Sequence, residues 1–452
     1  MMSHGSRPTT IDLHRHVYGG IAAPWWLTHI AGRRINPGPY ESAWLRMYDQ
    51  PSPLRALLQR YQRNDQHVIE DFRRLFEFHQ KDGPGFERFQ LHHDLITWTS
   101  ALADPQLLRR PTQRFAEELP LVIDHVAEQC RREGLGAAEL RLMLPAGMRP
   151  AVARWAWALF SHCCGQASTT SCRIDGIASL SRSHAVPQWR DLADCLRAGE
   201  AGGIVGVDFS HREERSRIQD LLPVSEQIHA FNAQNPRHAV ALVVHVGESY
   251  EGICLESALR RIHQAVRLLR PHRIGHAVAA GIAPQHHGVH ERSETVRERL
   301  EHLTWECEHA DSLTQHGIAV DTAQLRHERS TLLQRDPRQR LRRTYDHRLL
   351  EEFSQRQQWL RHILRRQQQI IEVCPTSTQR IAGIRDHHHH HVHAFLDEDL
   401  TVVLGSDDPG LFATTLSQEC ALVEQWRGED CRHLTERVGA CSRYLSGRDT
   451  LS

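Results

Sequence analysis

Eight short apolar runs, separated by polar and helix-like stretches, constrain the fold of this chain more than any other feature. Runs that are apolar without alternation are expected of parallel strands buried on both faces. They are residues 11–17, 138–144, 173–180, 203–209, 241–246, 273–277, 369–374 and 401–405. Helical periodicity between them, as in 114–132 and 257–269, is typical of repeated βα units. We therefore predict an α/β fold, a (β/α)8 TIM barrel, with a doubly wound sheet as the alternative.

Two connections between these runs are too long for simple crossovers. Residues 18–137 are predicted to form a helical insertion over the barrel mouth, and residues 278–368 a charged helical insertion, within a single domain of residues 1–452. The second insertion carries charges at the i, i+3 and i, i+4 spacing of an exposed helix. These residues are Glu294, Arg297, Glu298 and Glu301. We expect a solvated face or an oligomer contact there.

Composition narrows the class of partner. Lysine plus arginine and aspartate plus glutamate number 55 each, so no net charge draws the chain to nucleic acid or a membrane. The 11 cysteines are scattered without a C-x-x-C pair, as in a reduced cytoplasmic protein. No apolar run is long enough to cross a bilayer. We predict a cytoplasmic protein with a small-molecule substrate, no nucleic-acid binding and no membrane contact.

A histidine tract at residues 387–391, followed by His393, is the one low-complexity segment. We interpret it as a polar helix start, and metal storage is the alternative.

Four short motifs close four of the predicted strands, where barrel active sites are built. They are D-L-H-R-H at 12–16, H-V-G-E at 245–248, R-I-G-H at 273–276 and S-D-D-P at 406–409. Residues two apart on a strand share a face, so His14 and His16 can bind one ion. Any one of these histidines is more often structural than functional, but imidazoles and a carboxylate at several strand ends together suit Zn²⁺.

These motifs, in this order, resemble the adenosine deaminase family of metal-dependent amidohydrolases. The family has D-L-H-x-H, H-A-G-E, R-I-G-H-G, E-x-C-P-x-S-N and S-D-D-P. This chain has I-D-L-H-R-H, H-V-G-E, R-I-G-H-A, I-E-V-C-P-T-S-T and G-S-D-D-P at matching strand ends. The likeness spans essentially the whole chain, and five motifs in register are specific.

The resemblance implies a zinc centre and named catalytic roles. The implied zinc ligands are His14, His16, His245 and Asp407. Zinc would lower the pKa of a bound water to about 7, giving a nucleophile for C6 of adenine. Glu248 would protonate ring N1, His276 would orient the nucleophile, and Asp408 would hold the purine through N7. The implied reaction converts adenosine, deoxyadenosine or ATP to the inosine counterpart with release of ammonia.

Two substitutions fall on expected substrate contacts. Tyr18 replaces an acidic residue near the ribose, and His211 replaces a glycine near the purine. Loss of a carboxylate there removes one barrier to phosphates, and nearby arginines can pair with them. Those arginines are Arg212, Arg380 and Arg385. The alternative is that both positions changed by neutral drift at exposed loops.

The enlarged connection at 278–368 is similar to that of the bacterial defence-associated branch, whose members deaminate adenosine or ATP inside large assemblies. This similarity predicts a homo-oligomer and allows a larger assembly. Two alternatives stay open: another amidohydrolase reaction, and a catalytically reduced barrel that serves as an assembly or regulatory subunit of a defence complex. The deaminases that act on flipped bases are disfavoured, because no P-C-x-x-C accompanies the H-x-E at 211–213.

Overall fold

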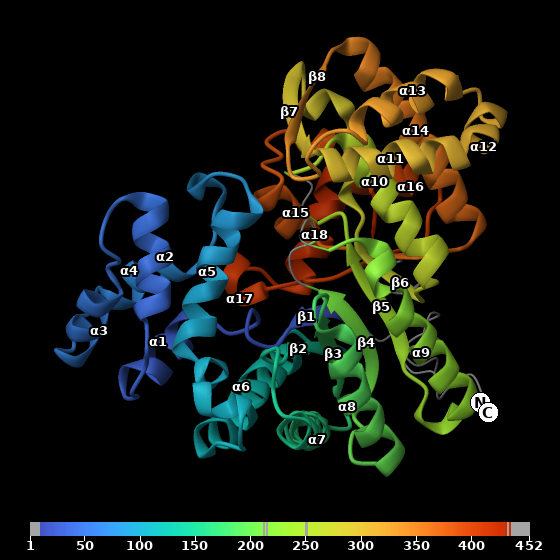
Figure 1. Cartoon of the computed structure of the whole chain (residues 1–452). Helices are drawn as coiled ribbons and strands as arrows, with labels where there is room; N and C mark the ends of the chain where they lie inside the picture. Colours follow the sequence, from blue (N-terminus) through green and yellow to red (C-terminus); the bar gives the residue numbers. More distant parts are fainter. Residues whose placement is uncertain (1–9, 211–212, 214–215, 249–251, 432–433, 435–452) are drawn as a thin grey trace, which may run out of the picture.

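The computed structural model describes residues 10–210, 213, 216–248, 252–431 and 434. Eight parallel strands form one sheet (Figure 1), in the order β1-β2-β3-β4-β5-β6-β9-β10. They are β1 (Ile11–His16), β2 (Ala137–Met143), β3 (Arg173–Ser181), β4 (Ile204–Ser210), β5 (Ala241–Val246), β6 (Arg273–His276), β9 (Ile370–Val373) and β10 (Val402–Leu404). Each lies within one residue of the bounds predicted from an apolar run.

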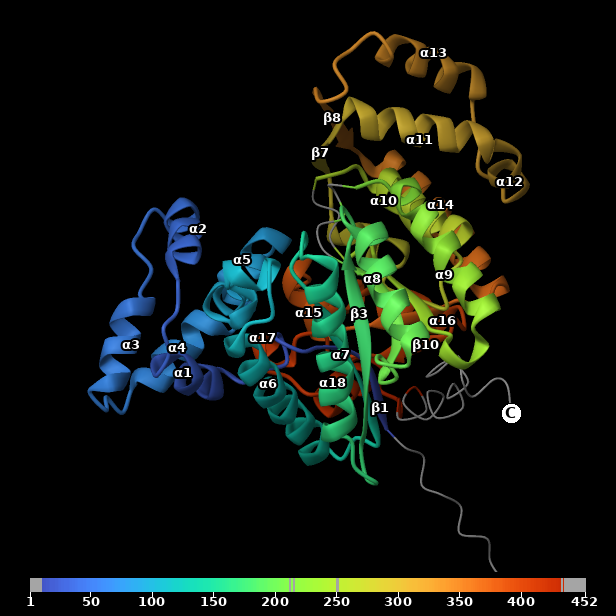
Figure 2. The same cartoon turned by 60° about the horizontal axis from the view of Figure 1, so that its bottom comes forward.

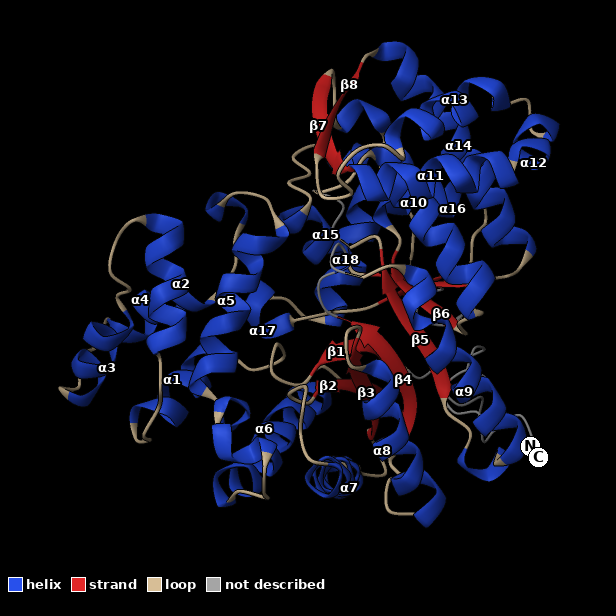
Figure 3. Cartoon of the chain, viewed as in Figure 1, coloured by secondary structure: helices blue, strands red, loops and turns tan. Residues whose placement is uncertain are grey.

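Backbone hydrogen bonds next to β10 join the two edges of this sheet. Asp407 donates its N–H to the carbonyl of His14 at 2.7 Å, and its own carbonyl accepts from the N–H of His16 at 2.8 Å. The sheet thus curls into a barrel with helices around it, which confirms the predicted (β/α)8 TIM barrel (Figure 3).

Helices that follow or precede the strands cover the outside of the barrel. They are α6 (Gln113–Arg132), α7 (Pro150–Ala167), α8 (Ala185–Ala198), α9 (Leu222–Gln234), α10 (Leu255–Gln264), α14 (His347–Arg366), α15 (Pro375–Ile381), α16 (His391–Asp397), α17 (Pro409–Phe412) and α18 (Leu416–Arg427). α6 shows why they form: the Thr112 hydroxyl caps it by accepting from the N–H of Phe115. Phe115, Leu119, Val122 and Val126 then recur at helical spacing and are fully buried.

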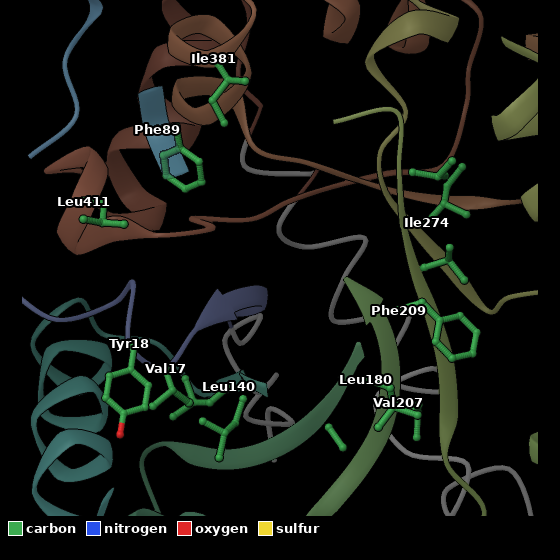
Figure 4. Packing of buried hydrophobic residues seen from close by; sticks show 14 of the residues in the cluster. Val17, Tyr18, Phe89, Leu140, Leu180, Val207, Phe209, Ile274, Ile381 and Leu411 are labelled. Carbon is green, nitrogen blue, oxygen red and sulfur yellow. The ribbon is translucent and has the colours of Figure 1, made fainter. Parts of the chain in front are cut away.

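Apolar side chains of the strands pack into one large core (Figure 4). Leu140, Leu180, Val207, Phe209 and Ile274 come from four different strands, and each is fully buried. Burial of this kind stabilises the barrel by about 25 cal/mol per Å² of apolar surface removed from water. The polar residues at the strand ends are therefore held on a rigid frame.

The first long connection, between β1 and β2, is helical and lies to one side of the barrel (Figures 1 and 2). It holds α1 (Ala23–Ala31), α2 (Gly38–Tyr48), α3 (Leu54–Gln62), α4 (Val68–Phe76), α5 (Phe86–Thr99) and then α6. Two contacts tie it to the segment after β10: the N–H of Phe78 donates to the carbonyl of Leu411 at 2.7 Å, and the rings of Phe89 and Phe412 stack at 5.1 Å.

The second long connection, between β6 and β9, is not purely helical. It contains an antiparallel pair of strands, β7 (His290–Thr295) and β8 (Arg340–Tyr345). Between these two strands the chain forms α11 (Val296–Glu308), α12 (Ala310–Gln315) and α13 (Thr322–Leu332). These elements lie above α10 in both views (Figures 1 and 2). None of the helices in the described part of the chain is both long and apolar enough to cross a membrane.

The prediction of an exposed charged helix around Glu298 is wrong in two respects. Glu294 lies in β7 rather than in a helix and is buried. Glu298, at the start of α11, is also buried and forms ion pairs with Arg260 and Arg261 of α10. Glu298 is buried because α11 packs against α10. The two arginines of α10 compensate its charge, as a buried charge requires.

Candidate metal centre and active site

Four histidine rings from three strands meet at the mouth of the barrel. His14 and His16 end β1, His245 lies near the end of β5, and His276 ends β6. The ring centroid of His14 is 4.7 Å from that of His245, 5.0 Å from that of His276 and 5.5 Å from that of His16. The close convergence expected from the sequence is present.

Asp407 brings a carboxylate to the same point from the chain after β10. Its Oδ1 is 3.3 Å from Nε2 of His16 and 3.6 Å from Nε2 of His14. The residue has a φ of 60°, a left-handed conformation that costs a non-glycine residue free energy and clusters at functional sites. The two backbone hydrogen bonds to β1 hold it there.

The donor atoms of these residues fit a divalent metal ion. The ligand atoms of His14, His16 and His245 lie within 4.8 Å of one another, and so do those of His14, His276 and Asp407. Nε2 of His14 and both ring nitrogens of His276 are buried without a hydrogen-bond partner among the described residues. Burial also lowers the pKa of His14 and of His276 well below the usual value, which keeps both imidazoles in the neutral form that binds metals.

Buried carboxylates behind the histidines fix the orientation of two rings. Nδ1 of His14 lies 3.0 Å from Oε2 of Glu372 on β9, and Nδ1 of His245 lies 2.9 Å from Oδ1 of Asp208 on β4. Such partners set the tautomer and raise the basicity of a metal-binding imidazole. Sequence reasoning assigned neither carboxylate a role, although Glu372 stands in I-E-V-C-P and Asp208 in G-V-D-F.

Two arginines inside the barrel neutralise these carboxylates. Arg141 forms ion pairs with Glu372 and, at 3.5 Å, with Asp208. Nε of Arg273 lies 2.7 Å from Oε1 of Glu372, and its Nη2 pairs with Glu139. Burial alone would raise the pKa of Asp208, but His245 and Arg141 outweigh it and hold that pKa below the usual range. Asp208 is therefore a carboxylate at neutral pH.

Glu248 lies on the same cavity, in the loop that follows β5. A second carboxylate, Glu213, holds that loop by accepting the backbone N–H of Gly247 at 2.8 Å and that of Glu248 at 3.0 Å. Sequence reasoning missed Glu213, because a contact between side chain and backbone leaves no motif in the sequence.

The cavity has a volume of about 550 Å³ and opens from the histidine cluster toward the first insertion. His16, Glu248, Asp407 and Asp408 line its polar end. Its wall also carries a group of large apolar side chains, among them Phe86, Phe89, Trp98, Leu102 and Met143. A volume in this range is typical of a small-molecule site.

The three residues predicted to contact the substrate are Asp408, Tyr18 and His211, and the structure describes the first two of them. Asp408 is buried on the cavity, and its Oδ1 has no hydrogen-bond partner among the described residues. Tyr18 also lines the cavity, but its hydroxyl donates to Oε1 of Glu118 at 3.2 Å. A Cβ on Gly19 would overlap Oδ1 of Asp408, so only glycine leaves room for this carboxyl. His211 lies outside the described residues.

Of the arginines proposed for phosphates, neither of the two that the structure describes lines this cavity. Nη1 of Arg380 donates to the carbonyls of Phe78 at 2.7 Å and Phe412 at 2.6 Å, so this guanidinium joins the first insertion to α17. Arg385 is exposed and does not line the described cavity. Arg212 lies outside the described residues.

A family model described as adenosine deaminase matches residues 343–438. The resemblance to the adenosine deaminase family is confirmed over these residues. The matched segment contains β9, β10 and the S-D-D-P motif, and so two of the barrel's eight strands and Asp407 and Asp408. No curated protein matches the chain.

Solved structures share the fold over nearly the whole chain. An adenine deaminase from Arthrobacter aurescens is 14% identical, with 93% of this chain and 88% of that chain covered and a TM-score of 0.51. The N6-methyl-AMP deaminase from Arabidopsis thaliana is 16% identical, with 98% and 97% covered and a TM-score of 0.52. An amidohydrolase from Burkholderia ambifaria with bound Zn is 13% identical, with 92% and 79% covered and a TM-score of 0.51.

Proposed function

We propose that this chain is a zinc-dependent hydrolase that removes the amino group of an adenine nucleoside or nucleotide and releases ammonia. The observation that carries the proposal is the convergence of His14, His16, His245 and Asp407 on a cavity that Glu248 also lines. The adenosine deaminase family match supports the reaction type. The solved relatives named as adenine and N6-methyl-AMP deaminases support an adenine ring as the target.

The proposed Zn²⁺ ligands are His14, His16, His245 and Asp407, a set of three imidazoles and one carboxylate that suits this ion. When bound, Zn²⁺ supplies a Lewis acid that makes water a nucleophile at neutral pH. The carboxylates of Glu372 and Asp208 would keep the His14 and His245 rings turned toward the ion.

The remaining side chains would bind the ring and move protons. Glu248 would donate a proton to ring N1, which makes C6 more electrophilic. His276, whose two ring nitrogens are buried and unpartnered among the described residues, would orient the attacking water. Asp408 would hydrogen-bond N7 through the carboxyl oxygen that has no described partner. Water adds at C6 and ammonia leaves, so the adenine ring becomes hypoxanthine.

The described cavity favours an uncharged nucleoside, adenosine or deoxyadenosine, over a phosphorylated substrate. Among its described lining residues Arg141 is the only lysine or arginine, and Glu372 and Asp208 already pair with it. Asp94 adds a carboxyl group to the same lining, and a carboxylate repels phosphate. The ATP version of the proposal therefore depends on residues outside the described part of the chain, such as Arg212.

An absorbance assay tests the proposal by following loss of the adenine band with adenosine, deoxyadenosine, AMP and ATP, together with ammonia release and zinc analysis. We expect turnover of adenosine by the zinc-loaded protein. An unchanged band with all four substrates would defeat the deaminase proposal. Membership of the defence-associated branch, a homo-oligomeric state and a cytoplasmic location stay predictions.

A further inference from the structure

The histidine tract forms a tight turn with two different faces. Residues His387–His389 make a 3₁₀ turn, and α16 begins at His391, so the predicted helix start is borne out in position. His390 and His391 are buried, whereas His388 and the preceding Asp386 are exposed and His387 is half-buried. The first part of the tract thus presents side chains to solvent.

Three of these side chains gather around one point. The ligand atoms of Asp386, His387 and His388 lie within 4.8 Å of one another, and the centroids of the two rings are 4.1 Å apart. Asp386 caps the turn: its Oδ1 accepts the N–H of His388, and its carbonyl accepts the N–H of His389, both at 3.0 Å. These hydrogen bonds therefore fix the positions of the three residues relative to one another.

His387 is held by its surroundings, yet its imidazole is incompletely paired. Its ring lies parallel to the Trp426 ring of α18, at 5.8 Å between centroids and 5° between planes. Nδ1 of His387 is buried and has no hydrogen-bond partner among the described residues. A buried polar nitrogen without a partner is unfavourable, and a metal ion beside it would remove that cost.

We propose that Asp386, His387 and His388 form a second divalent-cation site that takes Zn²⁺ or an ion of similar ligand preference. Two imidazole nitrogens and one carboxylate oxygen are a set that Zn²⁺ binds, with water completing the coordination. His389 borders the site, with its Nε2 at 3.9 Å from Oδ2 of Asp386. Because Asp386 and His388 are exposed, the ion exchanges with solvent, unlike the ion of a closed structural site.

The second site is separate from the barrel centre. None of its three residues lines the described cavity, and none contacts the four rings at the strand ends in the described structure. The proposal therefore stands whether or not the chain is a deaminase.

Zinc stoichiometry tests the proposal without reference to activity. Chelator-treated protein is titrated with Zn²⁺ against a chromogenic competitor, and bound metal is counted by mass spectrometry under non-denaturing conditions. We expect two ions per wild-type chain and one per chain of the double variant Asp386→Asn/His388→Ala. In the background Asp407→Asn, which weakens the barrel centre, the second ion should remain, and adding His388→Ala should weaken its binding at least tenfold.

The matched control is His327→Ala, which removes an exposed histidine of α13 and should leave both ions in place. Should the double variant fail to fold, His388→Ala alone supplies the same comparison, since that side chain is exposed. Equal numbers of bound ions in the wild type and the double variant, or an equal loss of bound ion in His327→Ala, would overturn the proposal.

Discussion

Oε1 of Glu213 accepts a hydrogen bond at 3.0 Å from the backbone N–H of Glu248, the proposed proton donor. The same carboxylate accepts the N–H of Gly247, so it fixes the turn that follows β5. Nη1 of Arg261 on α10 donates to the carbonyl of Glu213 at 2.6 Å, and Arg261 also pairs with Glu298 of α11. A chain of contacts thus joins the second insertion to the loop that carries Glu248.

Replacing Glu213 by glutamine should lower kcat with little change in bound zinc. An amide can accept only one of the two backbone N–H groups and presents a donor to the other, so Glu248 loses its fixed position. We expect a decrease of about 10- to 100-fold, the usual range for a supporting residue. Steady-state kinetics and zinc content measure the two effects. Glu308→Gln, on an exposed side chain of α11, should leave kcat unchanged, and an active Glu213→Gln would show that the loop needs no such support.

Replacing Glu248 by glutamine should abolish turnover while the metal stays bound. Glutamine keeps the size of the side chain but cannot give a proton to ring N1, and positioned proton transfer contributes about 10²- to 10⁴-fold to rate. Ammonia release and zinc analysis on the same preparation check both halves of the expectation. A variant with wild-type turnover would refute the role assigned to Glu248.

The strands and the histidine cluster were accessible from the sequence for physical reasons. A strand buried on both faces must be apolar along its length, and His14 and His16 must share a face because they lie two residues apart. Parallel strands that close a barrel then bring their carboxyl ends together. Those rules suffice to place His245, His276 and Asp407 close to β1.

The supporting contacts were not accessible in this way. Charges at helical spacing look the same whether they face water or another helix, so the burial of Glu298 against Arg260 and Arg261 could not be foreseen. Glu213 acts on backbone groups, which carry no sequence signal. Glu372 was within reach, because it is a charged residue in the middle of an otherwise apolar strand.

Replacing Asp208 by asparagine should weaken metal binding. Asp208 accepts from Nδ1 of His245 and also pairs with Arg141. An amide in its place gives His245 a weaker hydrogen bond, so the ring is held less firmly, and it leaves the charge of Arg141 with less compensation. We expect the zinc affinity to fall by about 10- to 100-fold, measured by competition with a chelator. Asp194→Asn, on the surface of α8, is the matched control, and equal affinities in both variants would contradict the role given to Asp208.

The buried carboxyl of Glu419 makes folding stability depend on pH. It accepts hydrogen bonds from the N–H of Thr376 at 2.8 Å and the hydroxyl of Thr414 at 2.6 Å, but burial still raises its pKa from 4.5 to about 7. A raised carboxyl pKa means that the folded state holds its proton longer than the unfolded state does. The Glu419 contribution to stability is therefore full below pH 4.5 and declines as pH rises toward 7.

The variant Glu419→Gln should lose this dependence. Relative to that of wild type, its free energy of unfolding should increase between pH 5 and pH 8 by about 1–3 kcal/mol, whatever the constant cost of the changed hydrogen bonds. Urea unfolding of both proteins at the two pH values measures the difference. A gap between the two proteins that is constant with pH would show that Glu419 is ionised throughout.

Gly19 should be irreplaceable for a reason that has nothing to do with backbone conformation. A Cβ at this position would overlap Oδ1 of Asp408, the carboxyl proposed to hold the purine. Gly19→Ala should therefore displace Asp408 and lower kcat/KM for adenosine by at least about tenfold, the effect of roughly 1.4 kcal/mol in transition-state binding. Gly32→Ala is the matched control, because nothing lies within 4 Å of a Cβ built there. Kinetics of the two variants, with zinc content and unfolding midpoints alongside, separate loss of the substrate contact from loss of metal or fold. If Gly19→Ala binds and turns over adenosine as well as Gly32→Ala does, Asp408 is not the residue that holds the ring.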